Sequence, residues 1–186
     1  MESAHGVRSW CIAYGAPIVS PGPDRLAELG LTPRGYHLAV ARFEPENHVL
    51  EIVRGYVDSA SSMPLVVVGD APYAESYRAQ VQAAAAGDSR VRLLGSIWDA
   101  DLLDTLYAHA TTYLHGHSVG GTNPSLLRAM GAGAPVTAYD VVFNREVAGM
   151  AGLYFRDPAG VARACLAAEA DPLATAERGL AGKSDV

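Results

Sequence analysis

Residues 111–140 read TTYLHGHSVGGTNPSLLRAMGAGAPVTAYD, and this stretch decides the fold. It opens with a short apolar run at 111–115, passes through a glycine-rich loop, and continues from Pro124 to about Met130 with a helical pattern. A second apolar run follows at 135–139. A strand, a loop, a helix and a second strand in this order predict a βαβ unit with parallel strands.

The same alternation extends in both directions from this unit. Further buried strands are predicted at 36–41, 64–70, 91–95 and 153–155, and helices at 44–57, 73–86, 99–107 and 158–170. We therefore expect an α/β fold over residues 36–170, a doubly wound, Rossmann-like and mostly parallel sheet with helices on both faces.

The two ends of the chain have weaker patterns. Residues 1–35 are expected to form an irregular lead-in with one short strand, at about 10–19. A short helix is expected there from Asp24, as its cap, to Leu29, with Gly30 ending it. Residues 171–186 show little periodicity and are expected to form a weakly structured tail.

Composition excludes several classes of protein. The chain has 186 residues, of which 49% are hydrophobic, and a net charge of -6, so an ordered domain without a basic nucleic-acid surface is expected. No apolar run is long enough to span a bilayer, and the first residues lack the apolar core of a signal peptide. Cys11 and Cys165 are interpreted as buried thiols in a reducing compartment. These features favour a cytoplasmic protein, whose partner could still lie at the inner face of a membrane.

A ligand is expected beyond the carboxyl ends of the strands, where several loops of unusual chemistry meet. The loop Gly120–Asn123 leads into a helix whose first N–H groups lack partners, which is typical of a phosphate site. The same residues also fit a plain turn, with Asn123 as the N-cap and Pro124 in the first turn. The loop matches neither a Walker motif nor GxGxxG.

Other polar residues at the strand ends allow two interpretations each. Arg42 suits bidentate binding of a phosphate, or an ion pair with Glu44 or Glu46. His115 and His117 face the same way on a strand and could hold a metal with His109 or Asp70, although hydrogen bonding to a ligand or the backbone is favoured. Asp70 could bind a ribose hydroxyl, but we expect it to cap the next helix.

Taken in order, five segments resemble the C-terminal half of a retaining glycosyltransferase of the GT-B type, from the large family 4. The segments are AVARFEPENH, LVVVGDAPY, VRLLGSIWDADLLDTLYAHA, the opening stretch and FNREVAGMAGLYF. The run HGHSVGGTNPSLL followed by AMGAGAPV is similar to a rhamnosyltransferase-like branch that builds cell-surface polysaccharides. The resemblance covers about Tyr14 to Ala170 and implies a domain that binds a nucleoside-diphosphate sugar as donor substrate, without a cofactor or metal.

The resemblance implies roles for individual residues. Arg42 would hold the diphosphate, and His117 and Gly120 would lie near the transferred sugar; Arg42 and His117 are the candidate catalytic residues. The remaining donor-binding candidates are Gly69, Ser96, Ile97, Gly121, Thr122, Asn123, Asn47 and Arg128. Gly69 would line the nucleotide pocket, and the backbone of Ser96 and Ile97 would contact the base.

Departures from the family pattern affect three of these positions. Asn47 stands where the family has a lysine that contacts phosphate. The family's two glutamates, with seven residues between them, fall on Gly120 and Arg128, and an arginine cannot accept a hydrogen bond from ribose. Arg128 could instead reach a phosphate, pair with Asp140 or Glu146, or mark a chain that has lost donor binding.

The resemblance leaves the family's N-terminal acceptor domain and its returning C-terminal helix unmatched. We therefore expect the donor half of a hexosyl- or deoxyhexosyl-transferase, inactive alone, that works with an acceptor domain, a partner chain or a second copy. A rival interpretation is a non-catalytic nucleotide-binding or interaction module. A doubly wound epimerase or dehydrogenase is disfavoured, because no glycine-rich dinucleotide turn follows the first strand.

Overall fold

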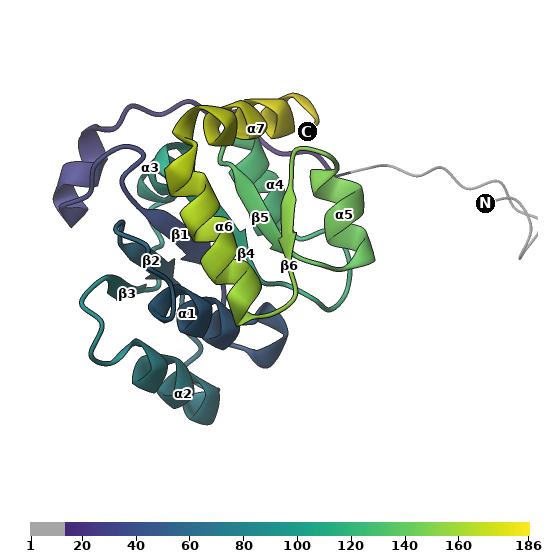
Figure 1. Ribbon diagram of the computed structural model, residues 1–186. Helices are drawn as coiled ribbons and strands as arrows, with labels where there is room; N and C mark the ends of the chain where they lie inside the picture. The colour runs from purple at the N-terminus through teal and green to yellow at the C-terminus, as the bar shows by residue number, and fades with distance from the viewer. Residues whose placement is uncertain (1–13) are drawn as a thin grey trace, which may run out of the picture.

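The computed structural model describes residues 14–186 and shows a six-stranded sheet (Figure 1). The strands are β1 (His37–Val40), β2 (Leu65–Val68), β3 (Val91–Gly95), β4 (Thr112–His115), β5 (Val136–Tyr139) and β6 (Leu153–Phe155). All run parallel, in the order β3-β2-β1-β4-β5-β6. The predicted doubly wound, Rossmann-like fold is confirmed, and so is each strand predicted between residues 36 and 155.

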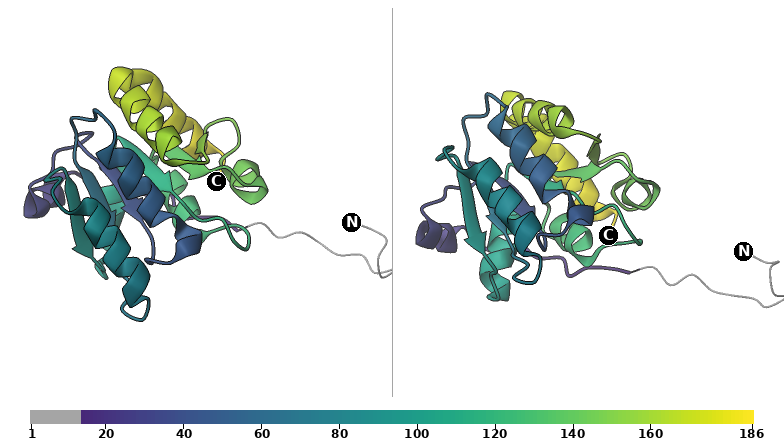
Figure 2. Two further views of the ribbon diagram at one scale, coloured as in Figure 1. Left: turned by 60° about the horizontal axis from the view of Figure 1, so that its bottom comes forward. Right: turned by 90° about the horizontal axis from the view of Figure 1, so that it is seen from below.

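Helices cover both faces of this sheet (Figures 1 and 2). One face packs against α1 (Val49–Val57), α2 (Glu75–Ala85) and α6 (Pro158–Ala170), the other against the 3-10 helix η1 (Asp24–Leu29), α3 (Ala100–His109) and α4 (Pro124–Gly131). A 3-10 turn, η2 (Pro45–Asn47), and two helices, α5 (Val142–Ala148) and α7 (Pro172–Ser184), complete the fold. Within residues 14–186, no helix combines the length and the apolar character needed to cross a bilayer.

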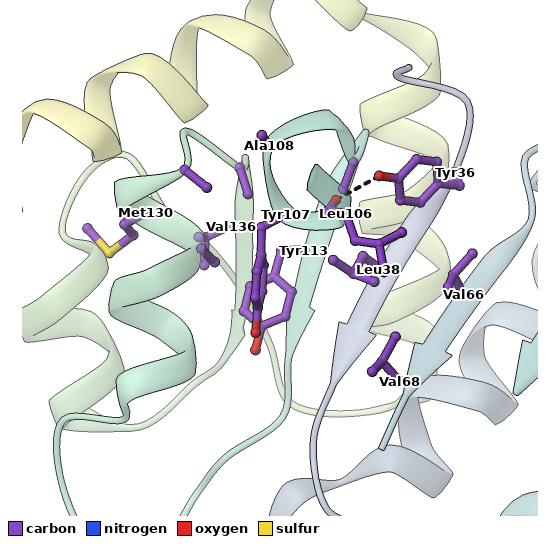
Figure 3. Close-up of a cluster of buried hydrophobic side chains, with 14 of the residues drawn as sticks. Tyr36, Leu38, Val66, Val68, Leu106, Tyr107, Ala108, Tyr113, Met130 and Val136 are labelled. Atoms are coloured by element: carbon purple, nitrogen blue, oxygen red, sulfur yellow. Dashed lines mark hydrogen bonds between the residues drawn. The ribbon is translucent and has the colours of Figure 1, made fainter. Parts of the chain in front are cut away.

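The core on the α3 and α4 face contains three tyrosines (Figure 3). Tyr36 donates a hydrogen bond of 2.7 Å from its hydroxyl to the carbonyl oxygen of Leu106, which ties the start of β1 to α3. The rings of Tyr107 and Tyr113 meet edge to face, 5.1 Å apart, between α3 and β4. These contacts satisfy or shield polar groups that would otherwise be costly to bury, and they hold the carboxyl-terminal half of α3 against β1 and β4.

The lead-in differs in part from its prediction. Residues 10–13 of the predicted strand, and Cys11, lie outside the described residues, and Tyr14–Val19 forms no strand. Instead the Val19 N–H bonds the carbonyl oxygen of Gly131, 3.2 Å away, so the segment runs along α4 rather than joining the sheet. Gly30 ends η1 in the left-handed region as predicted, at φ 59°, but Pro23 rather than Asp24 occupies the N-cap position.

The prediction of a weakly structured tail at 171–186 is wrong, because this segment forms α7. Asp171 caps the helix by accepting a hydrogen bond from the Ala174 N–H, 3.0 Å away. The helix packs against α4 and β5 through small side chains, its buried residues being Thr175, Gly179 and Gly182. Helices are predicted from large apolar residues that recur every three or four positions. The buried face of α7 consists of small residues, so the sequence lacks this pattern.

We predict opposite outcomes for alanine at two glycines of α7. A Cβ on Gly179 would lie 2.4 Å from the carbonyl oxygen of Gly133, so Gly179→Ala must displace the helix and should lower the free energy of unfolding by about 1–3 kcal/mol. A Cβ on Gly182 would meet Ala151 at 3.6 Å, an ordinary contact. Gly182→Ala should therefore be neutral or gain up to about 1 kcal/mol of helix propensity. Urea denaturation of both variants measures this, and equal effects would contradict it.

Candidate functional site

A cleft of about 350 Å³ opens at the carboxyl ends of β1 to β4. The strand order reverses between β1 and β4, where the chain continues to β2 on one side and to β5 on the other. Loops that leave neighbouring strands in opposite directions part at this point and leave a crevice. Of the residues predicted for the site, those that line the cleft are Arg42, Asn47, Gly69, Ser96, Ile97, His117 and Asn123.

Two glycines let the backbone approach closely beside the cleft. Gly69 has φ 129°, and a Cβ there would lie 1.9 Å from the carbonyl oxygen of Ala41. Gly116 packs against η2, where a Cβ would lie 2.0 Å from the carbonyl oxygen of Asn47. Only glycine fits at either place, so the loops after β2 and β4 are held directly against the segment that follows β1.

Arg42 lies at the mouth of the cleft and is the only arginine or lysine among the described residues that line it. One guanidinium nitrogen is 3.3 Å from Glu44 Oε2, so the predicted ion pair with Glu44 is present. The Tyr73 hydroxyl bonds Glu44 Oε1 at 2.5 Å, which raises the pKa of Tyr73. Because the Arg42 side chain remains 69% exposed, its remaining N–H groups stay accessible to an anion.

Asn47 connects the loops after β1 and β4. Its side-chain Nδ2 donates to the carbonyl oxygen of Arg42 at 3.0 Å, and its Oδ1 lies 2.9 Å from His117 Nδ1. The backbone of His117 is held as well, since Asn144 Nδ2 donates to its carbonyl oxygen at 2.8 Å. Burial lowers the pKa of His117, against the opposing influence of Glu46 and the Val119 backbone.

His115 ends β4 beneath the cleft and is 3% exposed. Its Nδ1 lies 3.1 Å from the Tyr113 hydroxyl, which in turn donates to Ser125 Oγ at 3.1 Å. Ser125 Oγ donates to Asn123 Oδ1 at 2.8 Å. Burial, together with the nearby His117, lowers the pKa of His115 to about 3, so this imidazole is uncharged at neutral pH.

The glycine loop takes the form of the plain turn. Asn123 caps α4 by accepting from the Ser125 N–H at 2.9 Å, and Pro124 occupies the first turn. Gly120, Gly121 and Thr122 are exposed and stand outside the lining of the cleft. Among the described residues, no protein group accepts from the N–H groups of 121–123, so these donors face a ligand or solvent.

Arg128 points away from the cleft, and of the alternatives considered for it, pairing with Asp140 or Glu146 does not occur. Its Nε donates to Asp104 Oδ1 at 2.6 Å, and Nη2 donates to the carbonyl oxygen of Ala100 at 2.8 Å. Both acceptors belong to α3, because the side chain leaves α4 on the face that packs against that helix. Asp140 instead pairs with Arg145 and Arg156, which lower its pKa to about 2.

Two further predictions need correction. Asp70 does not cap α2, because four residues separate it from Glu75, where the helix starts; its Oδ1 accepts from the Ala71 N–H at 2.8 Å and pairs with Arg78 at 3.1 Å. His109, considered as a metal ligand with His115 and His117, lies at the far end of α3 and bonds the Pro21 carbonyl oxygen at 3.0 Å. Within residues 14–186, no three His, Cys, Asp or Glu side chains gather as metal ligands.

Trp98, Ser125 and Leu103 are among the cleft-lining residues that the sequence did not predict for the site. Trp98 lines the cleft from the loop after β3, yet 93% of it is exposed. Ser125 and Leu103 line it from α4 and α3. The aromatic residue directly after LLGSI, in a loop at the carboxyl edge of the sheet, was a signal that could have identified Trp98.

Comparisons with known proteins agree with this geometry. A family model described as "Glycosyl transferases group 1" matches residues 36–171. The chain is 28% identical over 124 residues to the O-antigen chain mannosyltransferase B of Escherichia coli. Among solved structures, Anabaena HepE in complex with UDP and glucose is similar with a TM-score of 0.77 and 18% identity, and sucrose-phosphate synthase of Thermosynechococcus elongatus with 0.76 and 24%.

These matches cover most of this chain but only part of each relative. The mannosyltransferase match includes 64% of this chain and 32% of that protein. HepE is covered to 50% and the synthase to 44%, by 91% and 90% of this chain. The chain thus spans about a third of the curated relative and about half of these two structures, with which it shares the fold.

The burial of His115 leads to a prediction about stability and pH. Its pKa is about 3 in the folded chain and near 6.5 in an unfolded one, so as pH falls below 6.5 only the unfolded chain gains this proton. Stability should decline over that window by up to about 1.4 kcal/mol per pH unit. His115→Asn keeps a donor for Tyr113 and removes the titration.

Denaturant titrations at several pH values between 6 and 4 measure this difference. The free energy of unfolding of the variant, relative to the wild type, should rise by about 1 kcal/mol for each pH unit of acidification. Groups that titrate in both proteins cancel in that comparison. Parallel curves for the two proteins would show that His115 is protonated in the folded state.

Proposed function

This chain belongs to the glycosyl transferases group 1 family, and we propose that it is the half of a glycosyltransferase that binds a nucleoside-diphosphate sugar. The observation that carries the proposal is a cleft at the strand switch point that has Arg42 at its mouth and Asn123, the cap of α4, in its lining, beside an exposed loop whose N–H groups at 121–123 are free. A guanidinium and unpaired backbone donors are the groups that a diphosphate requires. HepE, which has the same fold, was crystallised with UDP and with UDP-glucose.

In this proposal the chain stabilises the leaving group. The bond between the anomeric carbon and the diphosphate oxygen breaks, and an acceptor hydroxyl bonds to the same carbon while its proton passes to the departing diphosphate. The negative charge that develops on the diphosphate is met by Arg42 and by the amino end of α4. His117, Gly69 and the backbone of Ser96 and Ile97 would hold the sugar and the nucleoside in the cleft.

The transferred group is proposed to be a hexose or deoxyhexose, moved with retention of configuration. The similarity to an O-antigen chain mannosyltransferase supports this class and a role in polysaccharide synthesis. The rhamnosyltransferase-like branch is part of the same proposal and rests on the run HGHSVGGTNPSLL. We propose that the chain acts in the cytoplasm and uses nucleotide sugars there as its donor substrates.

We propose that the acceptor substrate, whose hydroxyl receives the sugar, binds to a second domain or chain that faces the cleft. The matched structures are about twice as long as this chain, which supports a second half. Large apolar side chains are exposed on the loops or helix starts after four successive strands, namely Tyr73, Trp98, Val119 and Val142. A rim of this kind suits a partner that closes over the sugar and excludes water.

The first test is a calorimetric titration of the chain with UDP, GDP, ADP and dTDP. We expect one of them to bind saturably, and Arg42→Ala to weaken that binding about tenfold to hundredfold, as the loss of a charge-assisted hydrogen bond implies. Arg163→Ala, which removes an exposed arginine from α6, serves as the matched control. A cleft that binds none of the four, or an Arg42→Ala variant that binds like the control, would contradict donor binding.

A second candidate function is a non-catalytic interaction module, and the position of Arg128 favours it. Where the family resemblance implies a carboxylate for ribose, this chain has an arginine that is paired with Asp104. In this case the wild-type chain should bind no nucleotide. The variant Arg128→Glu with Asp104→Asn, which supplies a carboxylate without an adjacent like charge, should acquire binding that Asp104→Asn alone lacks. Equal titrations for the two variants would exclude this explanation.

A further inference from the structure

His115 has an unsatisfied nitrogen beneath the cleft. Its Nε2 is fully buried, and no described residue offers it a hydrogen-bond partner. Leaving such an atom unpaired costs about 1–3 kcal/mol. Since His115 lines the cleft and the surrounding protein supplies nothing, the cleft is where a partner for this atom would enter.

The hydrogen-bond chain from Asn123 determines which nitrogen of His115 carries the proton. Asn123 Oδ1 can only accept, so the Ser125 hydroxyl donates to it, and Ser125 Oγ is then the acceptor for the Tyr113 hydroxyl. The Val40 carbonyl oxygen, 3.4 Å from the Tyr113 hydroxyl, can also only accept. Tyr113 therefore gives its single proton to Ser125 or to Val40, and at 3.1 Å it accepts from His115 Nδ1. The proton therefore lies on Nδ1, and Nε2 presents a lone pair.

We propose that His115 Nε2 accepts a hydrogen bond from a hydroxyl group of the bound ligand, either on the ribose or on the transferred sugar. This inference rests on the proposed donor-binding function and names the chemistry at one point of that site. The residues Tyr113, Ser125 and Asn123 are positioning residues, since they act through His115. A bare lone pair in a buried position repels carboxylate and phosphate oxygens, so this subsite selects neutral, hydroxyl-bearing groups.

His117 stands beside this subsite and extends it. The two imidazole rings are 6.1 Å apart, and Asn47 Oδ1 accepts from His117 Nδ1 because Asn47 Nδ2 is already used on Arg42. Asn47, which replaces a lysine of the family pattern, thus positions a histidine at the cleft. Both histidines carry their proton on Nδ1. Asn47 fixes this proton in His117, and the hydrogen-bond chain from the Asn123 cap fixes it in His115.

The first experiment needs no ligand. Long-range ¹H–¹⁵N NMR spectra report the protonation of each imidazole nitrogen, and His115 is expected to be uncharged with its proton on Nδ1 between pH 5 and 8. Tyr113→Phe removes the acceptor of that proton while keeping the ring, so in this variant the proton should distribute over both nitrogens. A proton on Nε2 in the wild type would overturn the inference.

The second experiment adds the nucleoside diphosphate that binds best, and then its glucose and mannose derivatives. The Nε2 resonance should shift on binding, and His115→Asn should weaken binding about tenfold, with His109→Asn as the matched control at the far end of α3. A shift with the diphosphate alone identifies a ribose hydroxyl, and a shift only with the sugar derivative identifies a sugar hydroxyl.

The outcomes separate this inference from the proposed function. If a nucleotide binds but neither Nε2 nor the affinity of His115→Asn changes, donor binding stands and the subsite is wrong. If no nucleotide binds to the wild type, both are overturned. A glucuronic acid derivative that binds more tightly through His115 than the glucose derivative would also contradict selection for neutral groups.

Discussion

The reversal of strand order between β1 and β4 is the constraint on which the site depends. If the segments after two neighbouring strands turned to the same side of the sheet, they would pack against each other and leave no space at the carboxyl ends of the strands. Because β1 continues to one side and β4 to the other, the segments after them separate and leave the crevice between them. The side chains in the cleft are then those that happen to follow the strands, which explains why residues as distant as Arg42 and His117 meet.

Within that crevice, polar groups are ordered from outside to inside. Arg42 is exposed at the mouth, the free backbone donors of 121–123 lie on an exposed loop, and His115 is buried beneath. Charge is tolerated where water can solvate it and is excluded where burial is complete. An anionic group and a neutral hydroxyl-bearing group on one ligand would therefore bind in a defined orientation, with the charged part outermost.

The sequence predicted the sheet well, because each strand is a short apolar run between loops of distinct composition. It also placed Arg42, Gly69 and Ile97 correctly at the carboxyl edge of the sheet, because parallel strands end at the same edge. What it missed depends on contacts between distant residues. Asn47 and His117 are 70 positions apart in the sequence. Arg128 pairs with Asp104 on a neighbouring helix and not with Asp140 or Glu146, which are closer in sequence. Helix α7 went undetected because its buried face is made of small residues, whose value lies in the close approach that they permit.

The hydrogen-bond chain from Asn123 to His115 has a consequence for energetics. All of its protons point in one direction, so a ligand that draws electron density from Nε2 polarises Tyr113 and Ser125 and finally the cap of α4. Binding at the helix cap and binding at the histidine then contribute to a single free energy of coupling, which by thermodynamic linkage is equal in both directions. If the proposed hydroxyl group binds His115, the floor of the cleft and the amino end of α4 are therefore coupled through these hydrogen bonds.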